Sequence, residues 1–382
     1  MPKLDLQRSD GPAWPSIAAV LILVFGSVTL SEESAGASRT GDPLPPQLAQ
    51  SEPSEAHARA LEAHERRDFE TAFSIWTELG AQGDTEAQFR LGTMYENAQG
   101  TKRDAQKAHD WYLKAAEAGH PEAQLNLGVL YENGEGVAQD LAAAADWYER
   151  AARQDIMLAQ YSLGLMYREG RGVTQDDGKA YKWLVQVAKR GYAVAQINVA
   201  FMLRDGIGVA QDYGSAAKWY RSAAGRGHPV AENNLGMLYA AGHGVEQNDK
   251  EAAVWYKKAA KQDLANAQYN LGAAYETGRG VIASDEEAAE WYRRAAEQGE
   301  GAAQVRLAEF YRDGRGMEQD LVSSYVWFDL AAVMAVSPDD RQRANAGRES
   351  VAQGLSSNQK RAAQEIAEAK KKRLGLLDAA EN

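Results

Sequence analysis

Apolar residues between positions 120 and 155 fall into two short stretches with helical spacing. The first stretch has apolar residues at i, i+4, i+7 and i+8, which form one face of a helix: Ala123, Leu127, Leu130 and Tyr131. A glycine-containing break follows at 134–136. The second apolar face lies after Asp140: Ala144, Trp147, Tyr148, Ala151 and Ala152. Because the linkers are short, the pattern predicts two antiparallel helices.

This helical pair recurs along most of the chain. Seven tryptophans are spaced 36 residues apart: Trp111, Trp147, Trp183, Trp219, Trp255, Trp291 and Trp327. A fixed period of this length is typical of a repeat array, in which each unit contacts mainly its neighbours. The period divides this part of the chain into seven repeats: 84–119, 120–155, 156–191, 192–227, 228–263, 264–299 and 300–335. A further helical pair is predicted over 56–83. We expect the tryptophan and tyrosine columns to form the core.

Two further columns indicate how each unit folds. The residues before the second helix are all good N-caps: Asp68, Asp104, Asp140, Asp176, Asp212, Asn248, Ser284 and Asp320. Replacing one of them by alanine is expected to cost about 1 kcal/mol. Most first helices also carry a glycine: Gly92, Gly128, Gly164, Gly236 and Gly272. Glycine destabilises a helix interior, so its recurrence predicts a close approach of the paired helix.

The ends of the chain differ from the repeats. Residues 1–37 combine basic residues, an apolar run and an Ala35-Gly36-Ala37 site, which predicts a cleaved signal peptide; an uncleaved membrane anchor is the alternative. Residues 38–55 form a proline-rich linker. The segment 336–382 is predicted to be a helical cap in which Ser356 and Gln359 form a capping box. Both interpretations of the N-terminus place the repeats outside the cytoplasm, most simply in the periplasm.

Composition narrows the possible functions. The net charge of −12 argues against nucleic-acid binding, which requires a basic footprint. The chain has no cysteine, so disulfides, thiol catalysis and thiolate metal sites are excluded. Its histidines lack metal-binding spacing, and we predict no metal and no cofactor.

The motif A-Q-x-x-L-G-x-x-Y-x-x-G-x-G-V, then D, then W-Y-x-x-A-A resembles the Sel-1-like repeat, a relative of the tetratricopeptide repeat. The second repeat, 120–155, carries this motif from Ala123-Gln124 to Trp147-Tyr148. Departures are local, such as Ala98 in place of the first loop glycine. The resemblance implies an all-α, right-handed α-solenoid of helix-turn-helix repeats. It also implies an adaptor in membrane-associated complexes, polysaccharide export or signalling.

Enzymatic motifs are weak by comparison. Ser215 and Lys218 match S-x-x-K, as do Ser357 and Lys360, but the accompanying S-D-N and K-T-G motifs are missing. The G-x-G loops lack the preceding strand of a phosphate-binding motif, and helix termination explains them better. We therefore predict that the protein is not an enzyme.

By analogy with tetratricopeptide geometry, an apolar stripe is predicted on the concave face of the central units. The candidate partner-binding residues are Tyr161, Leu165, Arg168, Ile197, Phe201, Arg204 and Met237. They either form a groove for a peptide or partner helix, or pack between adjacent first helices. A neighbouring column rich in asparagine, such as Asn234, either clamps a bound backbone or caps turns.

The predicted function is a protein-binding scaffold or regulator at the bacterial cell envelope, whose partner is another protein and not nucleic acid. The partner could belong to a membrane-associated envelope complex. Two alternatives stay open. A glycan-binding assembly factor would use Tyr161 and Tyr269 as stacking platforms, and a β-lactam or peptidoglycan hydrolase would require Ser215.

Overall fold

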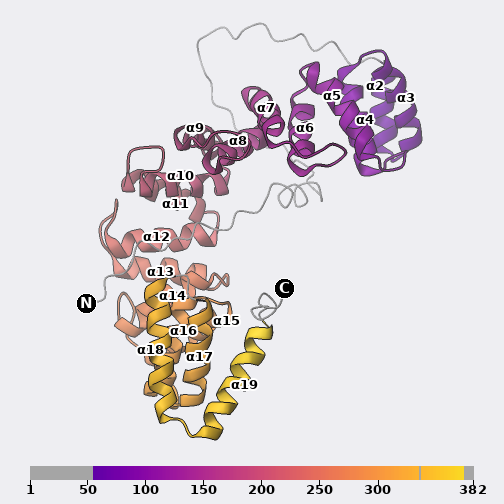
Figure 1. Cartoon of the computed structure of the whole chain (residues 1–382). Coiled ribbons are helices and arrows are strands. Elements are labelled where there is room, and N and C mark those ends of the chain that lie inside the picture. Colours follow the sequence, from indigo (N-terminus) through magenta and orange to yellow (C-terminus); the bar gives the residue numbers. More distant parts are fainter. Residues whose placement is uncertain (1–54, 335–336, 374–382) are drawn as a thin grey trace. The chain divides into compact units, whose positions relative to one another are not determined.

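The computed structural model describes residues 55–334 and 337–373, which fold into helices without strands (Figure 1). The chain divides into two compact units, Met1–Val187 and Ala188–Asn382, whose boundary falls within α9. Unit 1 contains α2 (Glu55–Glu65), α3 (Phe69–Ala81), α4 (Thr85–Asn97), α5 (Ala105–Glu117), α6 (Pro121–Asn133), α7 (Leu141–Arg153), α8 (Met157–Glu169) and most of α9 (Asp177–Lys189).

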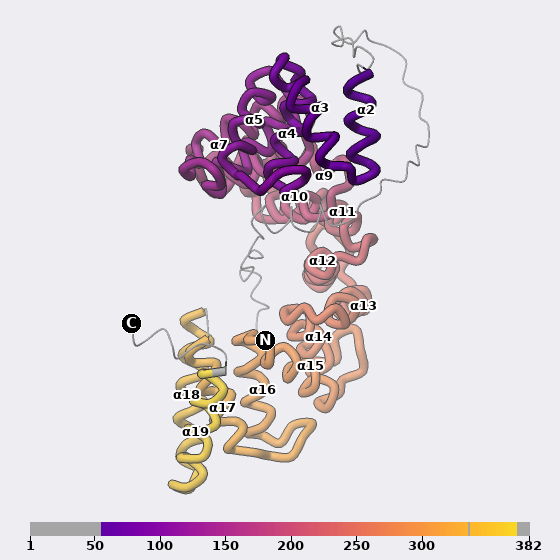
Figure 2. Tube along the Cα trace, turned by 90° about the vertical axis from the view of Figure 1, so that its right-hand side faces the viewer, coloured from indigo at the N-terminus to yellow at the C-terminus, as the bar shows by residue number. Residues whose placement is uncertain are grey.

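Unit 2 begins with the repeats that follow α9. Its helices are α10 (Ala193–Asp205), α11 (Tyr213–Ala224), α12 (Pro229–Ala241), α13 (Asp249–Ala260), α14 (Ala265–Thr277), α15 (Asp285–Glu297), α16 (Gly301–Asp313), α17 (Leu321–Met334), α18 (Pro338–Gly354) and α19 (Ser357–Arg373). Consecutive helices pack on one another in chain order from α2 to α8 and from α10 to α18 (Figure 2). The predicted all-helical repeat solenoid is therefore confirmed for the described residues. The proposed signal peptide and the linker up to residue 54 lie outside the described residues.

The predicted N-caps are confirmed in all eight positions. In each, a side-chain oxygen accepts a backbone N–H of the first turn of the second helix; Asp140 Oδ1, for example, accepts from the N–H of Ala143 at 3.0 Å. The others are Asp68, Asp104, Asp176, Asp212, Asn248, Ser284 and Asp320. The first helices end on a residue in the left-handed conformation, such as Gly134 with φ 72°.

Ala98 occupies this left-handed position in the first repeat, with φ 56°. A Cβ atom is strained there, whereas glycine is not. We expect Ala98→Gly to raise the free energy of unfolding of unit 1 by about 1 kcal/mol, measured as an increased urea midpoint. Ala118→Gly is the matched control, because exposed Ala118 ends α5 with φ −75°. A gain of the same size in the control would contradict this explanation.

In five of the seven repeats, the core is built around the tyrosine that follows the tryptophan; Leu184 and Phe328 take its place in the other two. Tyr148 of α7 is fully buried in a cluster with side chains of α6 and α8. A Cβ atom on Gly128 of α6 would lie only 2.6 Å from the Tyr148 ring. The predicted close approach at the glycine column is thus confirmed, and the group that approaches is this aromatic ring.

The tryptophan column is less buried than the sequence predicted. Trp111, Trp147, Trp183, Trp219 and Trp255 are partly exposed, and only Trp291 and Trp327 are buried. Trp147 packs its inner side on the core formed by α5 and α6. The Arg150 guanidinium lies over the Trp147 ring, with its carbon 4.5 Å from the ring centroid. The same cation–ring contact recurs in other repeats: Lys114 on Trp111, Lys258 on Trp255 and Arg294 on Trp291. The tryptophans therefore form the edge of the core.

The second glycine of each loop does more than end a helix. Gly136 has φ 69°, and a Cβ atom there would lie 2.8 Å from the backbone nitrogen of Gln106 and closer still to the Ala105 carbonyl. Both residues belong to the start of α5 in the preceding repeat. The loop of one repeat thus rests directly on the backbone of the repeat before it.

The C-terminal helices cover the end of the array. α18 packs on α16 and α17, and α19 packs on α17. The capping box is confirmed, since the Ser356 N–H donates to Gln359 Oε1 at 3.0 Å and the Gln359 N–H donates to Ser356 Oγ at 3.4 Å. In the basic run, the Lys371 ammonium lies 2.7 Å from Asp329 of α17. This lysine therefore anchors α19 to α17.

Candidate functional site

The candidate partner-binding residues of unit 1 lie on α8. Tyr161 and Leu165 are each only 6% exposed, so their side chains are packed in the interior. Arg168, near the end of the same helix, keeps a partly exposed side chain 3.4 Å from the Glu169 carboxylate. Among the candidate residues of unit 1, only Arg168 is therefore accessible to a partner.

Unit 2 presents a more open part of the same stripe. Ile197 is buried, but Phe201 of α10 and Met237 of α12 are only half-buried. Arg204 makes a two-pronged ion pair with Asp205, at 2.6 and 2.8 Å, and its guanidinium carbon lies 4.9 Å from the Phe201 ring centroid. It also donates to Asn234 Oδ1 on α12 at 3.1 Å. Arg204 itself is buried, so only the two apolar side chains remain partly accessible on α10 and α12.

The asparagine-rich column mainly supports its own helices. Asn234 Nδ2 donates to the carbonyl of Val230, one turn earlier, at 2.8 Å. Ser162 makes the equivalent bond to Leu158 at 2.7 Å. The side chain of Asn270 donates to Asn233 Oδ1 at 2.9 Å, which joins α14 to α12. These contacts favour the turn-capping alternative over a clamp for a bound backbone.

The residues of the alternative functions have local structural roles. Ser215 follows the N-cap Asp212, whose carboxylate accepts its backbone N–H at 2.9 Å. Tyr161 is buried, and Tyr269 packs against Tyr292 with 5.7 Å between ring centroids. Within 55–334 and 337–373, no group of three or more acidic, histidine or cysteine side chains is placed to hold a metal ion. None of the helices in that part of the chain has the length and apolarity of a membrane span.

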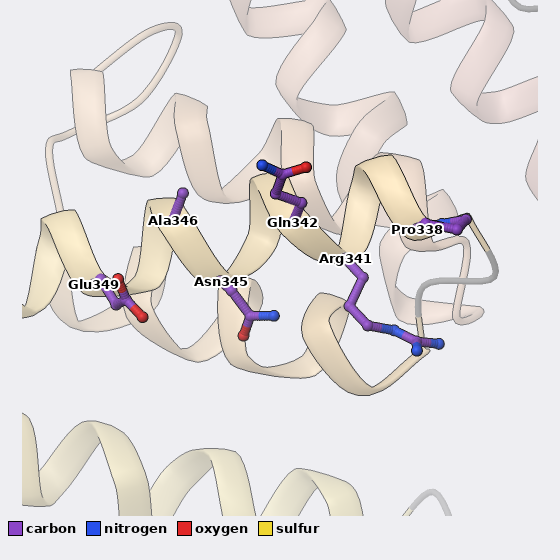
Figure 3. Close-up of a pocket in the computed structure, with 6 residues that line it drawn as sticks. All are labelled: Pro338, Arg341, Gln342, Asn345, Ala346 and Glu349. Atoms are coloured by element: carbon purple, nitrogen blue, oxygen red, sulfur yellow. The ribbon is translucent and has the colours of Figure 1, made fainter.

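A surface depression of about 490 Å³ lies on α18. Figure 3 shows that its lining side chains project from this one helix. They are Pro338, Arg341, Gln342, Asn345, Ala346 and Glu349. Because a single helix supplies every lining residue, the depression is shallow and open.

Sequence reasoning missed a set of buried carboxylates beside the core tyrosines. Tyr148 donates its hydroxyl to Glu132 at 2.7 Å, and Tyr292 donates to Glu276 at the same distance. Burial raises the pKa of Tyr148 well above its ordinary value. Burial alone would raise the pKa of Glu276 as well, but hydrogen bonds from Arg306 and Tyr292 outweigh it and lower that pKa. The recurring 16-residue separation between glutamate and tyrosine was the available sequence signal.

A second carboxylate joins the first two repeats. His120 Nε2 lies 2.9 Å from Glu86 Oε2, and His120 Nδ1 accepts the Ala123 N–H, so the ring donates to Glu86 and caps α6. The hydrogen bond with His120 is the main cause that lowers the pKa of Glu86 from 4.5 to about 2. The resulting stabilisation is present above pH 4.5 and is lost as the pH falls toward 2.

We therefore expect unit 1 to lose stability on acidification through this range, and Glu86→Gln to weaken that dependence. The measurement is the difference between urea midpoints at pH 6 and pH 3. Glu70→Gln, which removes an exposed carboxylate from α3, is the control for net charge. An unchanged pH dependence in Glu86→Gln would show that this pair does not govern acid stability.

This helical array is similar to those of known repeat proteins. The family model described as Sel1 repeat matches seven segments: 85–120, 121–156, 158–192, 193–228, 229–264, 265–300 and 301–332. The crystal structure of a Sel1 repeat protein from Oxalobacter formigenes is 31% identical, with a TM-score of 0.60; the match covers 75% of this chain and 88% of that one. No curated protein matches the sequence.

Two other solved structures are more distant. A protective antigen of uropathogenic Escherichia coli that displays an SLR fold is 28% identical over 83% of each chain, with a TM-score of 0.42. An immunity protein from Pseudomonas aeruginosa is 22% identical, with a TM-score of 0.22; the match covers 70% of this chain and 81% of that one. Since the family model covers more than half of the residues, the chain belongs to the Sel1 repeat family of scaffold proteins.

Proposed function

We propose that this protein is a non-enzymatic scaffold at the bacterial cell envelope that binds a partner protein through the first helices of its repeats. The observation that carries the proposal is the accessible surface of α10 and α12. There Phe201 and Met237 remain half-buried although comparable residues in α8 are packed away, and Arg204 is fixed beside Phe201. Two partly exposed apolar side chains, with Phe201 held in place by the buried Arg204, suit a peptide or helix with an apolar face.

The contact surface is therefore narrower than the stripe predicted from the sequence. Replacing buried Leu165 would disturb the interior and would not test binding. Phe201 and Met237 can be changed with less damage, because part of each side chain already meets solvent.

We expect Phe201→Glu combined with Met237→Glu to reduce partner capture from an envelope fraction at least about tenfold, because each change places a charge against an apolar contact. Helicity and the urea midpoint report whether the variant folds. Ile282→Glu is the control, since Ile282 is 90% exposed in a loop and lies outside the proposed surface. Undiminished capture by a folded double variant would exclude this surface.

Export is the second part of the proposal and rests on the sequence of residues 1–37. Cell fractionation with mass spectrometry tests it. A periplasmic product that begins at Ser38 would support a cleaved signal, and a full-length product bound to the inner membrane would support an anchor. A full-length product confined to the cytoplasm would contradict both.

A further inference from the structure

A glutamate near the end of the first helix is bound in the same way in repeats two and six. Glu132 accepts a hydrogen bond from Tyr148, and its other oxygen lies 2.7 Å from Arg171 Nη2. Glu276 is bound by Tyr292 and, at 2.8 Å, by Arg315 Nη1. The tyrosine follows the glutamate by 16 residues and the arginine by 39 residues in both cases. The two donors thus form a repeated carboxylate-binding pair.

The tyrosine of repeat five and the loop arginine of repeat six are both kept, but the glutamate of repeat five is missing. Tyr256 and Arg279 stand 16 and 39 residues after Ala240, which occupies the glutamate position. Arg279 makes the same ion pair as Arg315, since its Nη2 lies 2.8 Å from Asp249, just as Arg315 Nη2 lies 2.7 Å from Asp285. Where the glutamate would stand, Arg279 Nη2 instead donates to the Ala240 carbonyl, at 3.3 Å.

The tyrosine of repeat five is also left without its acceptor. No residue of the described part of the chain accepts a hydrogen bond from the Tyr256 hydroxyl. The residue is 5% exposed, so packing holds the ring in place. The ion pair with Asp249 likewise restrains the Arg279 guanidinium. Both donors are therefore fixed before any ligand arrives, which lowers the entropy cost of binding one.

We propose that Tyr256 and Arg279 bind a carboxylate side chain of the partner protein, which takes the place of the glutamate missing at position 240. Charge-assisted hydrogen bonds of this kind are short and strong. Met237 lies on α12 one turn before Ala240, so the partner segment would carry an acidic residue next to an apolar one. This inference rests on the proposed scaffold function and specifies the chemistry of its partner.

A fluorescein-labelled hexaglutamate peptide provides a direct probe, with hexaglutamine as the uncharged comparison. Fluorescence anisotropy with the full chain at about 0.15 M salt limits long-range repulsion by the acidic protein. We expect hexaglutamate to bind and hexaglutamine not to bind. Tyr256→Phe, which removes one hydrogen bond, is expected to weaken binding about tenfold. Ala240→Glu is expected to abolish binding and to raise the urea midpoint, because an internal carboxylate then occupies both donors.

Matched controls come from the tyrosine of repeat six and the loop arginine of repeat seven, which bind Glu276. Tyr292→Phe and Arg315→Gln alter donors already occupied by Glu276, so the peptide affinity is expected to stay unchanged. The inference is overturned if wild-type protein does not bind hexaglutamate, if Ala240→Glu binds it as well as wild type, or if the controls weaken binding equally. Partner capture lost in the Phe201 and Met237 variant but unaffected by Ala240→Glu would leave the scaffold function standing and reject the carboxylate site.

Discussion

Replacing Gly136 by alanine is expected to lower the free energy of unfolding of unit 1 by about 3 kcal/mol or more. Two costs combine at this position. The left-handed backbone, with φ 69°, is strained for any residue that has a Cβ atom. The new Cβ would also lie 2.8 Å from the Gln106 backbone nitrogen, and backbone cannot rotate away as a side chain can. Urea unfolding followed by circular dichroism measures the change.

Gly119→Ala separates these two costs. Gly119 has φ 96°, but a Cβ atom there would meet nothing within 4 Å. Its substitution should therefore cost only the conformational strain, about 1–2 kcal/mol. Equal losses in the two variants would mean that the contact between the loop and the preceding repeat contributes no stability.

Tyr148→Ala is expected to cost about 3–5 kcal/mol, as for other large aromatic truncations in a core. The change opens a cavity where α7 packs on α6 and α8, and it removes the hydroxyl that donates to buried Glu132. Trp147→Ala should cost less, about 2 kcal/mol, because Trp147 is only half-buried and contacts Arg150 on its outer side. Denaturant midpoints of the two variants give the comparison. A greater loss for Trp147→Ala would reverse the roles assigned to these two aromatic columns.

The sequence predicted the structure best at positions where a residue has a single role within its own helix. Asp140 and its equivalents predicted the start of every second helix, because a capping side chain bonds to its own first turn. The Ser356–Gln359 capping box was predictable for the same reason. The glycine at position 128 also indicated a close approach, since its cost within a helix requires a benefit.

Exposure was harder to predict, because it depends on neighbouring repeats. Trp147 and Tyr148 are adjacent and both recur at the period of 36 residues, yet only Tyr148 points fully into the core. Likewise, Leu165 and Phe201 occupy equivalent positions, but Leu165 is buried and Phe201 remains half-exposed. Periodicity identifies which residues share a helix face. It does not tell how closely the next helix covers that face.

The ion pairs between repeats depend on the order in which the repeats follow one another along the chain. Arg315 requires both Asp285, 30 residues earlier, and Glu276, 39 residues earlier, to satisfy its guanidinium. Moving repeat seven to follow repeat five would instead set this arginine opposite Asp249 and Ala240. Modules of identical length are consequently not interchangeable, and gene duplication or shuffling within this array would be constrained by the charges carried across each junction.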